Sequence, residues 1–265
     1  MGSTPAVASP PHGAAPAPRA QRLQDLVRRV EFGLFGPRLE VWREQRKRHA
    51  IDRLRRRTLV ITPMEAAVRL LHLKRLLPTP LVALDLFGKA GIMKTLEYVP
   101  FAESVEFYEV YGPFAAHARR ALPADKVTIR VADSIAAVRA GTTLRSDYSF
   151  VVMDNPISTF GGGYCENFDL FPAVFDRLAP RSALVFNAAL DDWVAALDTD
   201  HVEHRRRRRA FFGAPLDAAH AANDLAAVMA GYARAVPADR FEILDLFPVP
   251  HPGDMMFLVM ALARR

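Results

Sequence analysis

Cysteine and long hydrophobic runs are what this sequence has least of. Cys165 is the only cysteine among 265 residues, so no disulfide can form within the chain, and we expect a reducing compartment, the cytoplasm. No apolar run approaches the ~20 residues that a helix needs to cross a bilayer, so we expect no membrane-spanning segment. The Pro/Ala-rich residues 1–19 lack the apolar stretch of a secretory signal and predict a disordered tail.

Recognisable metal-ligand spacings are also missing. His201, Glu203 and His204 have suitable side chains, but their spacing is not that of an HExxH zinc motif. No histidine partner can be named for Cys165, which we interpret as an ordinary small residue rather than a nucleophile. We therefore expect neither a bound metal nor cysteine-based catalysis.

Positive charge, in contrast, is abundant and clustered. The net charge is +6 and the isoelectric point about 9.8. One cluster of Arg and Lys covers residues 43–57, and a second is the run of five arginines at 205–209. Both clusters could be solvated helix faces, or they could contact a polyanion backbone such as that of RNA.

The hydrophobic pattern predicts a basic helical extension followed by an α/β domain. Residues 20–61 have helical periodicity, and the capping box Thr62-Pro63-Met64-Glu65 begins a new helix at the start of a domain over 62–265. Strands are expected at 81–86, 104–109, 127–132, 148–154 and 181–187, with helices near 91–98, 113–122, 134–140 and 167–179. This alternation predicts parallel βαβ units. After a helix at 216–236, strands at 241–250 and 255–264 are too close for a crossover and predict an antiparallel pair.

Acidic residues stand at the ends of four expected strands. They are Asp85, Glu109, Asp133 and Asp154. Because the carboxyl ends of parallel strands meet at one edge of a sheet, these side chains are expected to line one ligand crevice.

Five βα units closed by an antiparallel pair resemble the class I, Rossmann-like S-adenosylmethionine-dependent methyltransferases, from about residue 62 to the end. The resemblance implies a seven-stranded, mostly parallel sheet and S-adenosylmethionine as cofactor. In that family a glycine-rich turn follows the first acid, the second acid holds the ribose hydroxyls, and an acid after the third strand meets the adenine. Carried over to this sequence, the implied cofactor-binding residues are Asp85, Phe87, Gly88, Gly91, Glu109, Asp133 and Ser134.

The fourth strand ends in Asp154-Asn155-Pro156-Ile157, which looks like a variant of the Asp/Asn-Pro-Pro-aromatic motif of many N-methyltransferases. The resemblance implies that Asp154, Asn155 and Pro156 are catalytic residues that orient a target nitrogen. Phe160 or Tyr164 would supply the ring that Ile157 lacks. The function expected is N-methylation, with RNA favoured as substrate because of the positive charge.

The turn departs from the family pattern at one position. Lys89 stands where the family has the glycine that comes closest to the cofactor. A turn shifted by one residue would direct Gly88 toward the cofactor and Lys89 away from it. Two alternatives stay open: a small-molecule biosynthetic methyltransferase, and a non-catalytic protein that retains the fold.

Overall fold

The computed structural model describes residues 36–58, 60–154, 167, 170–189, 210–212, 225–251 and 255–265. The chain divides into two compact units, Met1–Arg43 and Glu44–Arg265. The first described helix, α2 (Gly36–Arg55), runs across this division, so its second half belongs to the larger unit. The expected tail at 1–19, and the expected helix over 20–35, lie outside the described residues.

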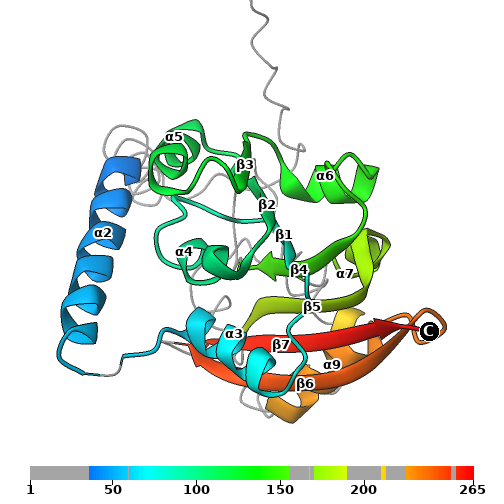
Figure 1. The fold of residues 1–265 in the computed structure, drawn as a ribbon. Coiled ribbons are helices and arrows are strands. Elements are labelled where there is room, and N and C mark those ends of the chain that lie inside the picture. The colour runs from blue at the N-terminus through cyan, green and yellow to red at the C-terminus, as the bar shows by residue number, and fades with distance from the viewer. Residues whose placement is uncertain are drawn as a thin grey trace, which may run out of the picture. The chain divides into compact units, whose positions relative to one another are not determined.

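The larger unit is built on a seven-stranded sheet with the order β3-β2-β1-β4-β5-β7-β6 (Figure 1). The first five strands are parallel, whereas β7 is antiparallel to both β5 and β6. This arrangement confirms the predicted fold class. The strands are β1 (Val82–Asp85), β2 (Ser104–Tyr108), β3 (Val127–Arg130), β4 (Tyr148–Met153), β5 (Leu178–Ala189), β6 (Phe241–His251) and β7 (Met255–Arg264).

The strand order contains a switch point between β1 and β4. From β1 the chain continues outward through β2 and β3, and from β4 it continues in the opposite direction to β5. Ligands of open α/β sheets bind outside the carboxyl ends of the strands at such a point. Asp85 ends β1 and Asp154 directly follows β4, so these two acids flank it.

Helices and short 3-10 turns connect the strands. They are α3 (Pro63–Leu73), α4 (Thr95–Tyr98), η1 (Val99–Phe101), α5 (Gly112–Ala121), α6 (Ser134–Ala140), α7 (Phe171–Val174), η3 (Phe175–Arg177) and α9 (Leu225–Arg234).

Two expected helices are shorter than predicted. The helix expected near 91–98 covers only Thr95–Tyr98, because Lys89 and Gly91 have the positive φ angles of a turn and the chain remains in turns up to Lys94. The helix expected over 167–179 becomes helical at Phe171 and gives way to β5 at Leu178, which pairs with Tyr148. In both places the helical sequence pattern extends beyond the helix itself. The turn after β1 shortens the first helix, and pairing of β5 with β4 ends the second.

The sheet is buried on both faces. Val82 and Leu84 pack with Phe171, Phe186 and Tyr232 in one hydrophobic cluster. Their neighbours along the strand point to the opposite face, where residues of α3 complete a second cluster that includes Ala83, Phe107, Phe150, Val68 and Leu71. A sheet covered in this way holds its strand ends rigidly, which matters for any site built on them.

Candidate functional site

Asp85 is the central carboxylate of the candidate site. Only 3% of the residue is exposed, and its Oδ2 accepts hydrogen bonds from the Tyr98 hydroxyl at 2.5 Å and from Thr95 Oγ1 at 2.8 Å. Burial raises the pKa of Asp85, while the two hydroxyls and the nearby Lys94 oppose the rise. Because both donors come from α4, this four-residue helix fixes the carboxylate at the end of β1.

The turn after β1 requires glycine at two positions for different reasons. A Cβ on Gly88 would lie 2.0 Å from the Phe107 ring, so no side chain fits there. Gly91 has φ +72°, and a Cβ would lie 2.8 Å from Leu122. The Gly88 N–H donates to the Tyr108 carbonyl at 3.0 Å, which ties the turn to β2. Backbone atoms therefore line this part of the sheet edge.

Lys89 has a backbone conformation that glycine adopts most readily. Its φ is +51°, in the left-handed region that non-glycine residues seldom adopt. Its side chain is 44% exposed; the ammonium pairs with Glu44 of α2 at 2.9 Å and lies 5.9 Å from the Phe114 ring. The Lys89 side chain thus links the turn to α2.

Glu109 follows β2 and lies beside the same turn. It is 8% exposed, and its carboxylate accepts the Tyr111 N–H at 2.6 Å. Burial raises the pKa of Glu109, whereas the backbone N–H groups of Tyr111 and Lys89 lower it. Asp85 is close enough to raise it further. The structure therefore brings Asp85, the glycine turn and Glu109 together.

Asp133 caps a helix. Its Oδ1 accepts from Ile135 N at 2.9 Å and from Ala136 N at 3.1 Å, which makes it the N-cap of α6. Ser134 is the first residue of α6 and is buried. Phe87 is partly buried and packs against the cluster of Val82 and Leu84. Asp133 and Ser134 thus stand at the start of α6, and Phe87 lies in the turn after β1; their binding of a cofactor stays a prediction.

Lys94 is a residue that the sequence analysis missed. Its ammonium forms an ion pair with Asp154, whose side chain is only 6% exposed, and lies 5.6 Å from the Phe257 ring. Burial lowers the pKa of Lys94 to about 8, although Asp85 and Glu44 oppose the shift. One signal was available, because the loop after β1 must reach the end of its neighbour β4 and Lys94 is a cation in that loop.

Four predicted site residues lie outside the described part of the chain: Asn155, Pro156, Phe160 and Tyr164. The same is true of Cys165, of the His201 to His204 segment and of the arginines at 205–209. Among the residues that the structure describes, no group of three His, Cys, Asp or Glu is placed to hold a metal ion. Within the same residues, no helix has the length and apolarity needed to span a membrane.

Comparison with known proteins gives matches by structure only. No family model matches the sequence, and no curated protein matches it. Trm1 from Pyrococcus horikoshii, solved with S-adenosyl-L-methionine, superposes with a TM-score of 0.52 at 14% identity, over 76% of this chain and 54% of Trm1. The chain has the class I methyltransferase fold. Asp85, the glycine turn and Glu109 thus occupy the carboxyl edge of a methyltransferase-type sheet.

Other methyltransferase structures are similar at lower scores. A SAM-dependent methyltransferase from Leishmania major has a TM-score of 0.48 at 11% identity, covering 75% of this chain and 70% of its own. An rRNA methylase from Streptococcus thermophilus has a TM-score of 0.46 at 12% identity, covering 78% of this chain and 100% of its own.

Proposed function

We propose that the protein is an S-adenosylmethionine-dependent methyltransferase that methylates a nitrogen atom, with RNA as its substrate. The observation that carries the proposal is the glycine turn between two buried acids, Asp85 and Glu109, at the switch point of a methyltransferase-type sheet. The Trm1 structure with which this fold superposes contains S-adenosyl-L-methionine.

The residues present fit this cofactor. Ribose hydroxyls and an adenine amino group are hydrogen-bond donors, and carboxylates are acceptors with several lone pairs. Glu109 accepts backbone N–H groups and retains acceptor capacity for two hydroxyls. Both cap bonds of Asp133 fall on Oδ1, which leaves Oδ2 for an amino group. Gly88 lets the turn pack directly against the Phe107 ring, which keeps the backbone of the turn at the sheet edge between the two acids.

On the acceptor side, Asp154 and Lys94 would act as a pair. The cofactor supplies a methyl group carried on a positively charged sulfur. Asp154 would accept a hydrogen bond from the target amine, which takes over the place of the Lys94 ammonium. An amine nitrogen must lose a proton around the time of methylation, and Lys94 in its neutral form can receive one, because its pKa is about 8. Holding the acceptor in line provides much of the remaining rate enhancement.

RNA is supported by charge. The net charge of +6 favours an anionic substrate, and several cations of α2 are exposed. A direct test is to incubate the protein with tritiated S-adenosylmethionine and bulk RNA, and to measure label that is resistant to protease and sensitive to nuclease. Asp154→Asn is expected to reduce incorporation strongly while cofactor affinity stays nearly the same, because the lost contact is to the acceptor. Label confined to small molecules would instead favour a biosynthetic methyltransferase.

One observation favours a second candidate, a non-catalytic protein that retains the fold. Lys89 occupies the turn position that is glycine in the family, and its side chain is paired with Glu44. If this pair closes the turn, the parent protein binds no cofactor and Lys89→Gly restores binding. If the parent binds cofactor and Lys89→Gly changes the affinity little, this candidate is eliminated.

A further inference from the structure

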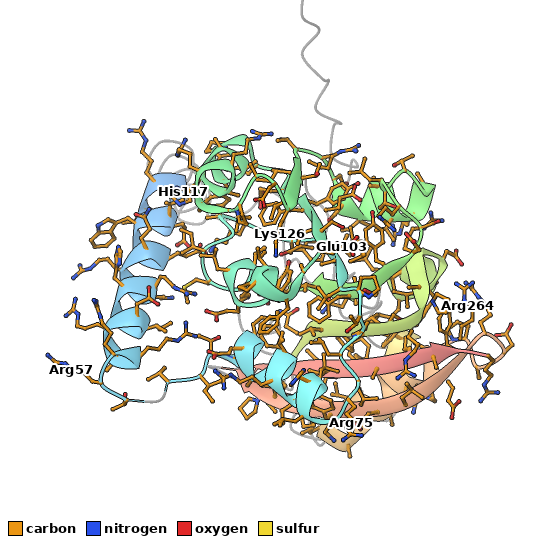
Figure 2. The ribbon with its side chains drawn as sticks, viewed as in Figure 1. Arg57, Arg75, Glu103, His117, Lys126 and Arg264 are labelled. Carbon is orange, nitrogen blue, oxygen red and sulfur yellow. The ribbon has the colours of Figure 1, made fainter. Side chains whose placement is uncertain are left out.

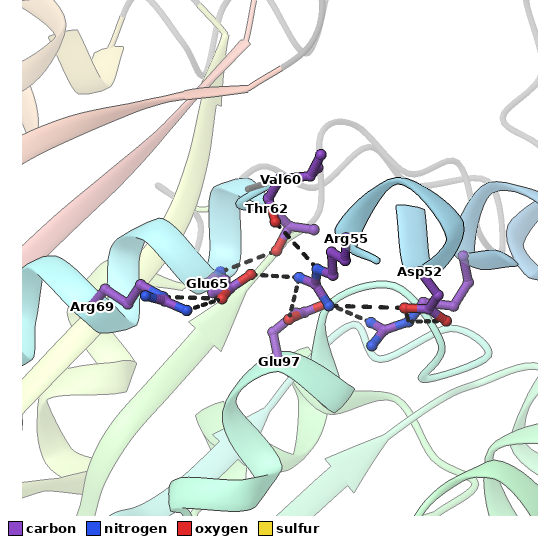
Figure 3. Close-up of polar contacts among 8 residues, drawn as sticks. Asp52, Arg55, Val60, Thr62, Glu65, Arg69 and Glu97 are labelled. Carbon is purple, nitrogen blue, oxygen red and sulfur yellow. Dashed lines mark hydrogen bonds and ion pairs between the residues drawn. The ribbon is translucent and has the colours of Figure 1, made fainter. Parts of the chain in front are cut away.

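The cationic helix α2 uses part of its charge to attach itself to the domain. Arg48 and Arg55 both pair with Glu97 of α4, whose side chain is only 6% exposed. Figure 3 shows the pair of Arg55 and Glu97. Arg55 also contacts Glu65 at 2.5 Å and donates from Nε to the Val60 carbonyl at 3.2 Å. These two arginines therefore have fixed positions against α3 and α4.

A third arginine, Arg69 of α3, is held by the same acid as Arg55. Arg69 donates to Glu65 Oε1 from Nη2 at 2.6 Å and from Nε at 3.0 Å (Figure 3). Glu65 is thus shared between Arg55 of α2 and Arg69 of α3. One carboxylate thus holds two guanidinium groups, and Glu97 provides a second negative charge beside Arg55.

The turn that follows α2 adds cations that take no part in this attachment. Arg56 and Arg57 are exposed, and neither has an ion-pair partner among the described residues. Figure 2 shows Arg57 at the C-terminal end of α2, directed away from the rest of the domain. Together these groups border a hollow of about 520 Å³, which is lined by Arg55, Arg56, Arg57, Thr58, Val60, Glu65 and Arg69.

The lining of this hollow indicates which ligand it fits. Arg55 pairs with Glu97 and shares Glu65 with Arg69, so the surplus of positive charge in the hollow comes mainly from the exposed Arg56 and Arg57. Guanidinium groups bind phosphate oxygens with paired hydrogen bonds. The exposed Arg56 and Arg57 can make such bonds, whereas Arg55 and Arg69 already donate to acceptors of the protein. The lining contains no aromatic ring on which a base could stack. The ligand is therefore recognised through its phosphate and not through its bases.

We propose that this hollow, at the junction of α2 and α3, binds the phosphodiester backbone of a nucleic acid chain. The identification of this chain as RNA rests on the proposed function. The identification of a phosphate-binding site rests only on the arginines that line the hollow. The site is separate from the crevice at Asp85 and Asp154. It is tied to the crevice through Arg55 and Glu97, because the α4 helix that carries Glu97 also holds Asp85 through Tyr98.

The test uses the full chain and a matched pair of double variants. Arg56→Ala/Arg57→Ala removes two cations of the hollow, and Arg119→Ala/Arg120→Ala removes two exposed cations from the last turn of α5. Binding of a fluorescently labelled single-stranded RNA is followed by anisotropy over a range of salt concentrations. We expect the first variant to bind about tenfold more weakly, equivalent to ~1.4 kcal/mol. Its salt slope should fall by about 1.4, the value for two phosphate contacts on a single strand. The control should behave like the parent.

Two results would overturn the inference. They are an unchanged affinity and salt slope in the Arg56/Arg57 variant, and an equal loss of affinity in both variants. The four substituted arginines, two in each variant, are exposed, so both variants are expected to fold. Circular dichroism checks that they do. Calorimetry with S-adenosylhomocysteine on the same samples keeps the two proposals apart. If RNA binding depends on Arg56 and Arg57 but the cofactor does not bind, the hollow stands and the proposed function fails.

Discussion

Single residues decide whether the turn after β1 can approach a cofactor. Gly88 is constrained by packing, since a Cβ would meet the Phe107 ring, whereas Lys89 tolerates its left-handed backbone with the side chain directed to Glu44. A glycine position forced by packing and a lysine in a glycine conformation are both consistent with a turn whose backbone shape is fixed.

We predict that Gly88→Ala destabilises the protein by about 1–3 kcal/mol, because the new methyl group must displace the Phe107 ring or the turn. Gly112→Ala is the control, since a Cβ on Gly112 would meet nothing within 4 Å. The free energies of unfolding are compared in urea. Equal stabilities for the two variants would show that the turn is not packed against Phe107.

A second residue-scale prediction concerns the acidity of Lys94. Its pKa of about 8 in the folded protein lies below the ordinary value of 10.5, so between these pH values the folded protein binds fewer protons than the unfolded chain. From this group alone, the free energy of unfolding rises with pH across that window. Carbon-13 NMR of the reductively methylated protein, with Lys94→Arg for assignment, measures the pKa. A titration near 10.5 would rule out Lys94 as a proton acceptor.

The helices and strands whose bounds were predicted best are those with capping or turn residues at both ends. Helix α6 matches its expected range because Asp133 caps its start and Gly141, at φ +69°, ends it. The start of β5 could not be predicted, because Pro180 resembles a boundary whereas pairing with β4 begins the strand at Leu178. Long-range pairing, which no local pattern encodes, made the difference.

The candidate site likewise has a part that local sequence patterns predict and a part that depends on long-range packing. Strand-end acids follow from the alternation of strands and helices, so Asp85 and Glu109 could be placed from sequence. The pairs Lys94–Asp154 and Lys89–Glu44 join segments far apart in the chain and depend on how the loops and α2 pack. The cluster at 43–57 likewise had to be divided by structure into attached and exposed cations.

The attachment of α2 gives an element-scale prediction. Glu97→Gln leaves Arg48 and Arg55 without their shared buried charge and should cost about 2–3 kcal/mol of stability, less than a fully buried pair because both arginines are partly exposed. Glu103→Gln, an exposed acid before β2, is the control. Urea unfolding measures the loss, and limited trypsin digestion shows whether α2 is cleaved faster. Identical unfolding curves would mean that the ion pairs do not hold α2.

At the scale of the whole molecule, the sheet and the positively charged surface beside α2 are suited to different ligands. The sheet order creates a switch point with buried acids on both sides, where small ligands bind. The positive surplus at the end of α2 lies apart from that point and suits a large anionic partner. The two proposals, a cofactor site at the switch point and a polyanion site beside α2, together describe what a nucleic acid methyltransferase requires.

The most direct test of this account is calorimetric titration of the parent protein with S-adenosylmethionine. The account predicts saturable one-to-one binding. It also predicts that Glu109→Ala weakens binding by about 1–3 kcal/mol, the cost of leaving ribose hydroxyls without their acceptor. Glu103→Ala, at the opposite end of β2, should leave the affinity unchanged. Absence of binding by the parent at a cofactor concentration of about 1 mM, which corresponds to ~4 kcal/mol of binding free energy, would contradict the account.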